Sequence, residues 1–363
     1  MKIKNISLIL LALILIFLVG CSNNKEPEES IEEEKLTGVE GEDKEEEATE
    51  EAGEESSGNR SPLSGRVVEE ELLNRPVVGV MFDNHPNARP QAGFYDAEVI
   101  YEFFVEGRAT RYLAFFLMND PEMIGPVRSA RPYYLEKAME YDAVYAHAGA
   151  SSRVTEEIAA SGIQNVSLLG PGSSAFRREP HRKAPHNAYT DMDSLRSTAE
   201  DLNYRESSDF EGFLFHDAKT APENGEAAEV FEVRYHASYL AEYRYDEVKQ
   251  GYQRYYVGEQ QYDETHRDDD QKPIIATNVL VQIVPARQIP GSSSGVLEMD
   301  TIGSGKGYYF TMDQRIEVLW EKNSNQDLTR YYDLDGEEIH LNPGQTWVQV
   351  ISNEEQLTIK NRE

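Results

Sequence analysis

Residues 111–118 form a run of apolar and aromatic side chains with almost no polar interruption after Arg111. A strand of this composition is stable where both of its faces are buried, in the middle of a sheet. The other expected strands are 76–84, 95–105 and 143–148, and the expected helices are 133–141 and 154–160. Strands that alternate with helices predict an α/β domain built on a mixed sheet, with an α+β arrangement as the alternative.

Three residues indicate where helices begin and end. Pro132 suits the first position of a helix, because its missing N–H is not needed there. Gly162 suits the left-handed position that follows a helix. Asp191 and Asp193 resemble the start of a calcium loop, but Arg196 stands where an EF-hand requires glycine. We therefore interpret Asp191 as a helix cap.

Arginines are concentrated in a proline-framed segment that follows the 111–118 run. Arg128 and Arg131 lie between Pro126 and Pro132 in a chain of net charge −31. Functional groups in α/β sheets gather at the carboxyl ends of strands. A guanidinium group matches the oxygens of a carboxylate or phosphate bidentately. This segment therefore predicts a site for an anion.

A second basic cluster extends from Arg177 to His186, with four basic residues and two histidines. We interpret Arg182, His186 and Asn187 as another lobe of the anion site. The alternative is a solvated basic loop that pairs with the acidic surface. The complete candidate set for ligand binding is Arg89, Glu102, Glu106, Arg111, Arg128, Arg131, His147, Arg182, His186 and Asn187.

Two carboxylates in this set are expected to orient the arginines. If the strand at 95–105 continues, Glu102 and Glu106 share one face, about 13 Å apart. That separation is too large for a close acid–base pair. His147 and His186 would add hydrogen-bond donors.

The chain is expected to have two folded domains. The N-terminal domain is placed at 67–225. Short Tyr-rich runs separated by Gly- and Asp-containing turns predict a smaller, mostly-β domain at 226–363.

The first 21 residues have the layout of a lipoprotein signal peptide. Lys2 and Lys4 precede an apolar run, which ends in Leu-Val-Gly before Cys21, the only cysteine. Cys21 is the expected lipidation site, where a bacterial lipoprotein carries diacylglycerol. Residues 22–66 hold 16 acidic and 5 basic side chains and are expected to form a disordered linker. This layout predicts a protein that is lipid-anchored at the extracellular face of the cell membrane.

Charge and motifs exclude several functions. A net charge of −31 argues against binding nucleic acid, which requires clustered basic side chains. No H-E-x-x-H motif is present, and Gly307 stands where a phosphate-binding loop requires Ser or Thr. We therefore predict no metal and no cofactor.

Several of these segments resemble the YerB-like lipoproteins of Gram-positive bacteria, a family of domains of unknown function. The motifs that carry the resemblance are 83–91, 102–111, 124–132, 146–149 and 184–187. It covers nearly all of the chain after the linker. The resemblance implies an extracytoplasmic lipoprotein with an N-terminal α/β domain and a smaller C-terminal domain, and it implies no activity.

Three functions remain open at this point. The first is binding of an anionic envelope ligand or partner protein through the arginines. The second is an envelope enzyme that acts on phosphate esters or glycans, with Glu102 or Glu106 as base. The third is a scaffold in which the charged residues form a buried ion-pair network.

Overall fold

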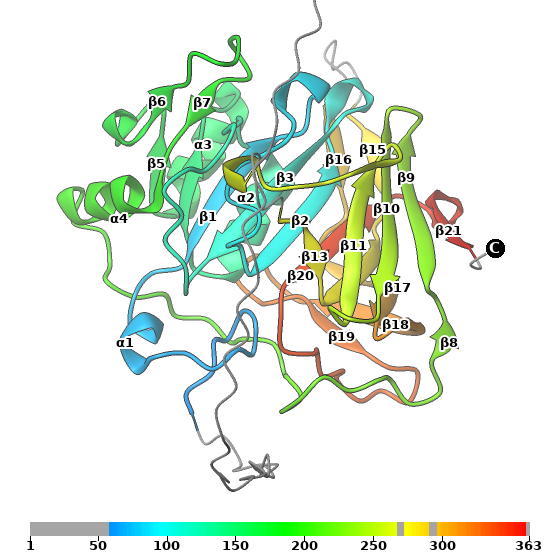
Figure 1. Ribbon diagram of the computed structural model, residues 1–363. Coiled ribbons are helices and arrows are strands. Elements are labelled where there is room, and N and C mark those ends of the chain that lie inside the picture. Colours follow the sequence, from blue (N-terminus) through cyan, green and yellow to red (C-terminus); the bar gives the residue numbers. More distant parts are fainter. Residues whose placement is uncertain (1–57, 267–271, 290–295, 361–363) are drawn as a thin grey trace, which may run out of the picture. The chain divides into compact units, whose positions relative to one another are not determined.

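A mixed sheet of eleven strands runs through the structure, a computed structural model that describes residues 58–266, 272–289 and 296–360 (Figure 1). Its strands, in spatial order, are β19 (Arg330–Tyr332), β18 (Gln314–Lys322), β17 (Gly303–Thr311), β14 (Asn278–Ile283), β20 (Thr346–Ile351), β2 (Val99–Phe104), β3 (Thr110–Phe116), β1 (Val78–Asp83), β4 (Val144–His147) and β5 (Asn165–Ser167), and β8 (Glu226–Ala227) pairs with β18.

Both halves of the chain contribute to this sheet. Strand β3 lies antiparallel between β2 and β1, and β4 and β5 continue from β1 in parallel. Strand β20 pairs in parallel with β2 on one side and β14 on the other. The predicted mixed sheet is therefore confirmed, and it does not end with the N-terminal half.

A smaller sheet and two hairpins come mainly from the second half of the chain. The smaller sheet contains β12 (Glu259–Gln260), β11 (Gly251–Tyr256), β10 (Tyr239–Asp246), β9 (Val230–His236) and β21 (Leu357–Lys360), with β13 (Ile275–Ala276) paired to β11. The hairpins are β6–β7 (Arg177–Arg178, Ala188–Tyr189) and β15–β16 (Ala286–Gln288, Leu297–Met299). The second half is thus mostly β, as predicted.

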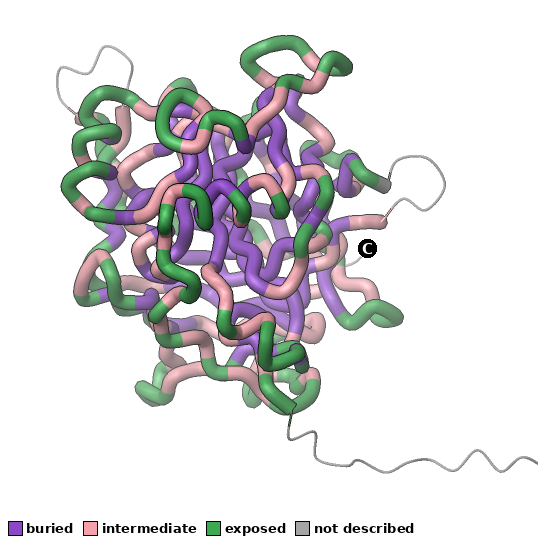
Figure 2. Tube along the Cα trace, turned by 90° about the vertical axis from the view of Figure 1, so that its left-hand side faces the viewer, coloured by how far each residue is buried: buried purple, intermediate pink, exposed green. Residues whose placement is uncertain are grey.

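Alternating side chains of the large sheet fill two cores. Val78, Val80 and Phe82 of β1 belong to one core, and Met81 belongs to the other. Helices α2 (Pro132–Glu140) and α3 (Ser152–Ser161) pack on the Met81 side. The smaller sheet and α4 (Met192–Asp201) pack on the opposite side. Figure 2 shows the buried residues along the interior strands and the exposed ones mostly in loops.

The remaining helical segments are short. They are α1 (Glu70–Leu73) and the 3-10 turns η1 (Pro86–Ala88), η2 (Glu106–Arg108), η3 (Ser173–Ala175), η4 (Glu264–His266) and η5 (Glu354–Gln356). None of the helices in the described ranges combines the length and the apolar character needed to cross a bilayer.

The predicted helix ends are confirmed. Pro132 is the first residue of α2, and Gly162 follows α3 with a φ of 72°. The Asp191 side chain caps α4 by accepting a hydrogen bond from the backbone N–H of Ser194 at 2.8 Å.

One strand prediction needs correction. The strand expected at 95–105 ends at Phe104, and Glu106 begins the turn η2, where Gly107 has a φ of 75°. A residue without a Cβ adopts this left-handed conformation easily, so the chain turns there. Glu102 and Glu106 therefore do not lie on one strand face, and they have different partners.

The end of the expected linker also differs from the prediction. Leu63 is fully buried, and the Ser61 and Ser64 hydroxyls donate to Glu98 at 2.5 and 2.7 Å. Residues 58–66 therefore belong to the folded part, because they close the core and hydrogen-bond a buried carboxylate. The signal peptide and the rest of the linker lie outside the described residues.

A buried ion pair joins the two sheets. Arg254 of β11 donates through Nη2 to Glu102 Oε2 of β2 at 2.5 Å, and both side chains are fully buried. Thr110 and Asn84 donate to the other oxygen of Glu102 at 2.7 and 3.1 Å. The guanidinium also lies 4.3 Å from the ring centre of Trp347. The pair is thus desolvated but fully hydrogen-bonded, the condition under which a buried charge is tolerated.

Replacing Arg254 with methionine should lower the free energy of unfolding by about 3–5 kcal/mol, because Glu102 is left buried without its partner. The double variant Arg254→Met with Glu102→Gln should be less destabilised than Arg254→Met alone. Urea denaturation of the three proteins measures this. Arg244→Met is the control, because the Arg244 side chain is half-exposed in its pair with Glu242 and such pairs contribute at most about 1 kcal/mol. Equal losses for Arg254→Met and Arg244→Met would contradict the prediction.

Candidate functional site

The arginine segment crosses the carboxyl ends of β1 and β4. Val127 forms a bridge with Phe82 of β1, and the Arg128 N–H donates to the Met81 carbonyl at 3.0 Å. The Arg128 carbonyl accepts from Ala148 just after β4 at 2.9 Å. Because β1 and β4 are parallel, both strands end at this edge. The predicted position of the arginines at strand ends is therefore observed.

Three arginines share two carboxylates at this edge. Arg131 pairs with Glu106, with 2.8 Å between Nε and Oε2 and a second contact through Nη2. Arg111 Nη2 lies 4.0 Å from Glu106, and Nη1 donates to the Ser129 carbonyl at 2.6 Å. Arg128 Nε lies 3.3 Å from Asp83 Oδ2. The group therefore carries one more positive than negative charge.

The pKa shifts at this edge come from burial and from the ion pairs. Burial lowers the pKa of Arg111 to about 10, and the charges of Arg131 and Arg128 add to the effect. Burial tends to raise the pKa of Glu106, but its hydrogen bond and ion pair with Arg131 lower it overall. The charges of Arg131 and Arg128 oppose that of Arg111, and a bound anion would relieve this repulsion.

A cavity of about 500 Å³ opens beside Arg131. Its lining residues are Glu106, Ser129, Arg131, Pro132, Ala148, Gly149, Ala150, Ser151, Arg153, Val154, Leu169, Ile289 and Val296. The first turn of α3 forms one wall, and the Ser151 hydroxyl caps it by accepting from the Val154 N–H at 3.4 Å. The other N–H groups of a first helical turn have no partner within the helix and favour an anion.

A second cluster surrounds Asp83 at the end of β1. His186 Nδ1 lies 2.7 Å from Asp83 Oδ2, and the backbone N–H of His85 donates to Asp83 Oδ1 at 2.9 Å. The rings of His85 and His186 stack with centroids 4.3 Å apart and planes 16° apart. Asp83 also pairs with Arg128, so this histidine cluster adjoins the arginine group.

The other predicted residues lie outside these two groups. Glu102 is paired with Arg254, and burial raises the pKa of Glu102 while that arginine opposes the shift. Arg89 donates to Asn84 and stacks 3.8 Å from the ring centre of Tyr256.

Arg182, His147 and Asn187 are held by the protein itself. Arg182 holds the neighbouring loop in place. It donates hydrogen bonds to the backbone carbonyls of Asn87, Arg89 and Pro90, to the Tyr189 hydroxyl and to the Glu264 carboxylate. His147 is buried with Nδ1 2.9 Å from the Gly149 carbonyl. Asn187 accepts from Arg178 at 2.9 Å. Of the expected second lobe, only His186 is linked to the arginine group, and the link runs through Asp83.

Sequence reasoning missed His85 and Arg153 as site residues. His85 is near Asp83 in the chain, but it meets His186 only because two distant loops fold together. Arg153 lines the cavity from the first turn of α3. The sequence did contain a signal for this wall of the cavity: Ser151-Ser152, a typical helix start, follows Gly149 closely.

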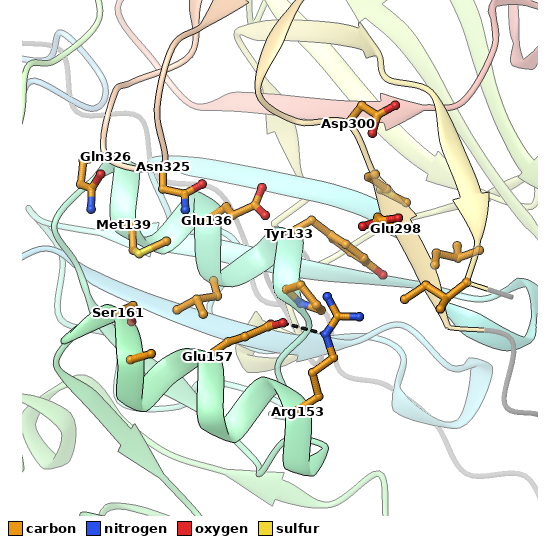
Figure 3. A pocket seen from close by; sticks show the side chains of 16 residues that line it. Tyr133, Glu136, Met139, Arg153, Glu157, Ser161, Glu298, Asp300, Asn325 and Gln326 are labelled. Carbon is orange, nitrogen blue, oxygen red and sulfur yellow. Dashed lines mark hydrogen bonds and ion pairs between the residues drawn. The ribbon is translucent and has the colours of Figure 1, made fainter. Parts of the chain in front are cut away.

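A different pocket of about 480 Å³ lies between α2, α3 and β16 (Figure 3). Glu136, Glu157, Glu298 and Asp300 line it, and Arg153 pairs with Glu157 at 2.7 Å. Within the described ranges, no three His, Cys, Asp or Glu side chains are arranged to hold a metal ion.

The fold and the site define a two-sheet protein with an arginine-lined cavity at the end of its mixed sheet. The chain belongs to the DUF3048 family, which is described as a protein of unknown function. The N-terminal domain model of that family matches residues 63–205, and the C-terminal domain model matches residues 231–348. The resemblance found in the sequence motifs is confirmed.

Two comparisons with individual proteins agree with this family. The chain is 30% identical to "Putative lipoprotein YerB" of Bacillus subtilis (strain 168) over 309 residues, which are 84% of this chain and 89% of that protein. The crystal structure of the YerB protein from Bacillus subtilis matches with a TM-score of 0.74 and 29% sequence identity, over 84% of this chain and 100% of that one.

Glu106→Gln should lower the free energy of unfolding by about 2 kcal/mol, because it leaves Arg131 and Arg111 without their shared carboxylate. Millimolar sulfate should restore more stability to this variant than to the wild type, since the excess positive charge has grown. Urea denaturation with and without sulfate measures both effects. The control is Glu317→Gln, whose pair with Lys306 is more exposed. Equal responses of the two variants to sulfate would contradict the prediction.

Proposed function

We propose that this protein is a lipid-anchored protein of the cell envelope that binds an anionic ligand in the cavity beside Arg131. The observation that carries the proposal is the charge imbalance at the strand ends, where three arginines share two carboxylates. Even in a chain of net charge −31, a local excess of buried positive charge lowers stability unless a bound anion neutralises it.

The shape of the site supports a compact anionic group. Arg131 and Arg153 contribute cationic side chains to the cavity, and the α3 first turn contributes backbone N–H groups. These donors suit a phosphate or a carboxylate. Arg111 lies behind Arg131 and adds charge without lining the cavity.

Lipid anchoring rests on the sequence before the folded part. Cys21 follows an apolar run and Leu-Val-Gly, the pattern of a lipoprotein cleavage site. The name of the similar Bacillus subtilis protein describes a lipoprotein. The acidic segment after Cys21 would then hold the ligand-binding part away from the extracellular face of the membrane.

Anion binding is tested by thermal denaturation of the full-length protein in detergent, with inorganic phosphate and with pyrophosphate. A ligand of the native state raises the melting temperature by mass action. We expect an increase for the wild type and for the control Arg244→Gln, and its loss in Arg131→Gln. If neither anion raises the melting temperature of the wild type, or if Arg131→Gln responds equally, the cavity is not an anion site and the scaffold function is favoured.

Anchoring is tested separately with Cys21→Ala. The variant should lose its diacylglycerol modification, and it should leave the membrane fraction after cells are lysed. Mass spectrometry of the N-terminal peptide and fractionation measure these outcomes. A wild-type protein without lipid on Cys21 would contradict the anchor and would leave the binding proposal unaffected.

A further inference from the structure

The histidine cluster at the end of β1 has the chemistry of a proton-transfer site. Asp83 Oδ2 lies 2.7 Å from Nδ1 of His186, and the carboxylate is almost completely buried. An ionised carboxylate can only accept, so Nδ1 of His186 carries the proton. In the neutral ring Nε2 is then left as a bare lone pair, which is the form of a base.

The neighbouring ring of His85 is held in the other tautomer. Its Nδ1 accepts a hydrogen bond from the Asn87 N–H at 3.1 Å, so its proton is on Nε2. Burial and the nearby His186 lower the pKa of His85, which favours the neutral ring. The stacked pair thus offers the Nε2 of His186 as a base and the Nε2–H of His85 as a donor.

A cation and solvent access complete the cluster. Arg128 contacts Asp83 through Nε, and within the described ranges its Nη groups make no hydrogen bond to the protein. The side chain of Arg128 is 29% exposed, that of His186 is 13% exposed, and His85 is exposed. Within the described ranges, the Nε2 atoms of His85 and His186 have no hydrogen-bond partner. The ion pair between His186 and Asp83 alone would require neither a free acceptor on His186 nor a free donor on His85.

We propose that His186, oriented by Asp83, is the general base of a phosphodiester hydrolase, with His85 and Arg128 as donors to the phosphate oxygens. The choice of a phosphate ester rests on the proposed anion binding at the arginine group, whereas the base and donor assignments rest on the tautomers. We choose the diester because it carries one negative charge, which matches the single excess positive charge of the arginine group.

The reaction balances with water as the only co-substrate. His186 Nε2 takes a proton from water as the water oxygen bonds to phosphorus. The bond between phosphorus and the leaving oxygen breaks on the opposite side of phosphorus, where solvent protonates the leaving oxygen, and His186 returns its proton to solvent. The products are a phosphomonoester and an alcohol. His85 Nε2–H and Arg128 stabilise the charge on the non-bridging oxygens throughout.

The test uses the full-length protein in detergent with bis(4-nitrophenyl) phosphate, and it follows the release of 4-nitrophenolate. We expect His186→Gln to lower the rate by about 100-fold or more. His85→Gln removes an exposed ring and should lower the rate by about 10-fold, with the melting temperature unchanged. The matched control is His340→Gln, because His340 and His216 also have neighbouring rings, with centroids 5.4 Å apart, but neither is hydrogen-bonded to a carboxylate in the described ranges. This variant should keep the full rate.

The outcomes separate this inference from the proposed function. If the wild type releases 4-nitrophenolate no faster than His186→Gln, the hydrolase is overturned, and phosphate binding that depends on Arg131 would still support the binding protein. An unchanged rate in His85→Gln would overturn the role of His85. Hydrolysis that is lost in His186→Gln supports the base even if phosphate fails to raise the melting temperature, and in that case only the cavity proposal fails.

Discussion

The buried pair of Glu102 and Arg254 is the contact on which the arrangement of the two sheets depends. Each charge would be very costly alone in the interior, and each is stabilised only by the other and by its remaining hydrogen bonds. Arg254 also reaches Gln261 and the Tyr243 hydroxyl. Because an apolar contact tolerates sliding whereas this network does not, the smaller sheet has one favourable position against β2.

The same network fixes the chain at the site. Asn84 donates to Glu102, to Thr110 and to the Tyr256 hydroxyl, and it follows Asp83 directly. Asn84 in turn accepts from Arg89 at 2.9 Å. The loop that presents His85 therefore starts from an immobilised residue. An interaction with β11, from the C-terminal domain, thus helps to fix a cluster whose residues all lie in the N-terminal domain.

Local patterns predicted the elements, and long-range packing determined the site. The buried strand near 111–118, the start of α2 at Pro132 and the arginines at the strand ends were all readable from neighbouring residues. The pairing of Glu102 with Arg254, 152 residues away, and the stacking of His85 on His186 were not, because no local signal specifies which distant charges meet. Glu106 was misplaced because one glycine turns the chain immediately after it.

If the cavity binds an anion as proposed, the strong negative charge of the chain limits which anions reach it. At physiological ionic strength the field of the surface carboxylates decays over about 8 Å, so an anion is repelled as it approaches and is attracted only when it is close to Arg131. A ligand with many charges along its length would be repelled over most of that length. The arrangement therefore favours a molecule that presents one compact anionic group to the cavity and keeps its remaining part neutral.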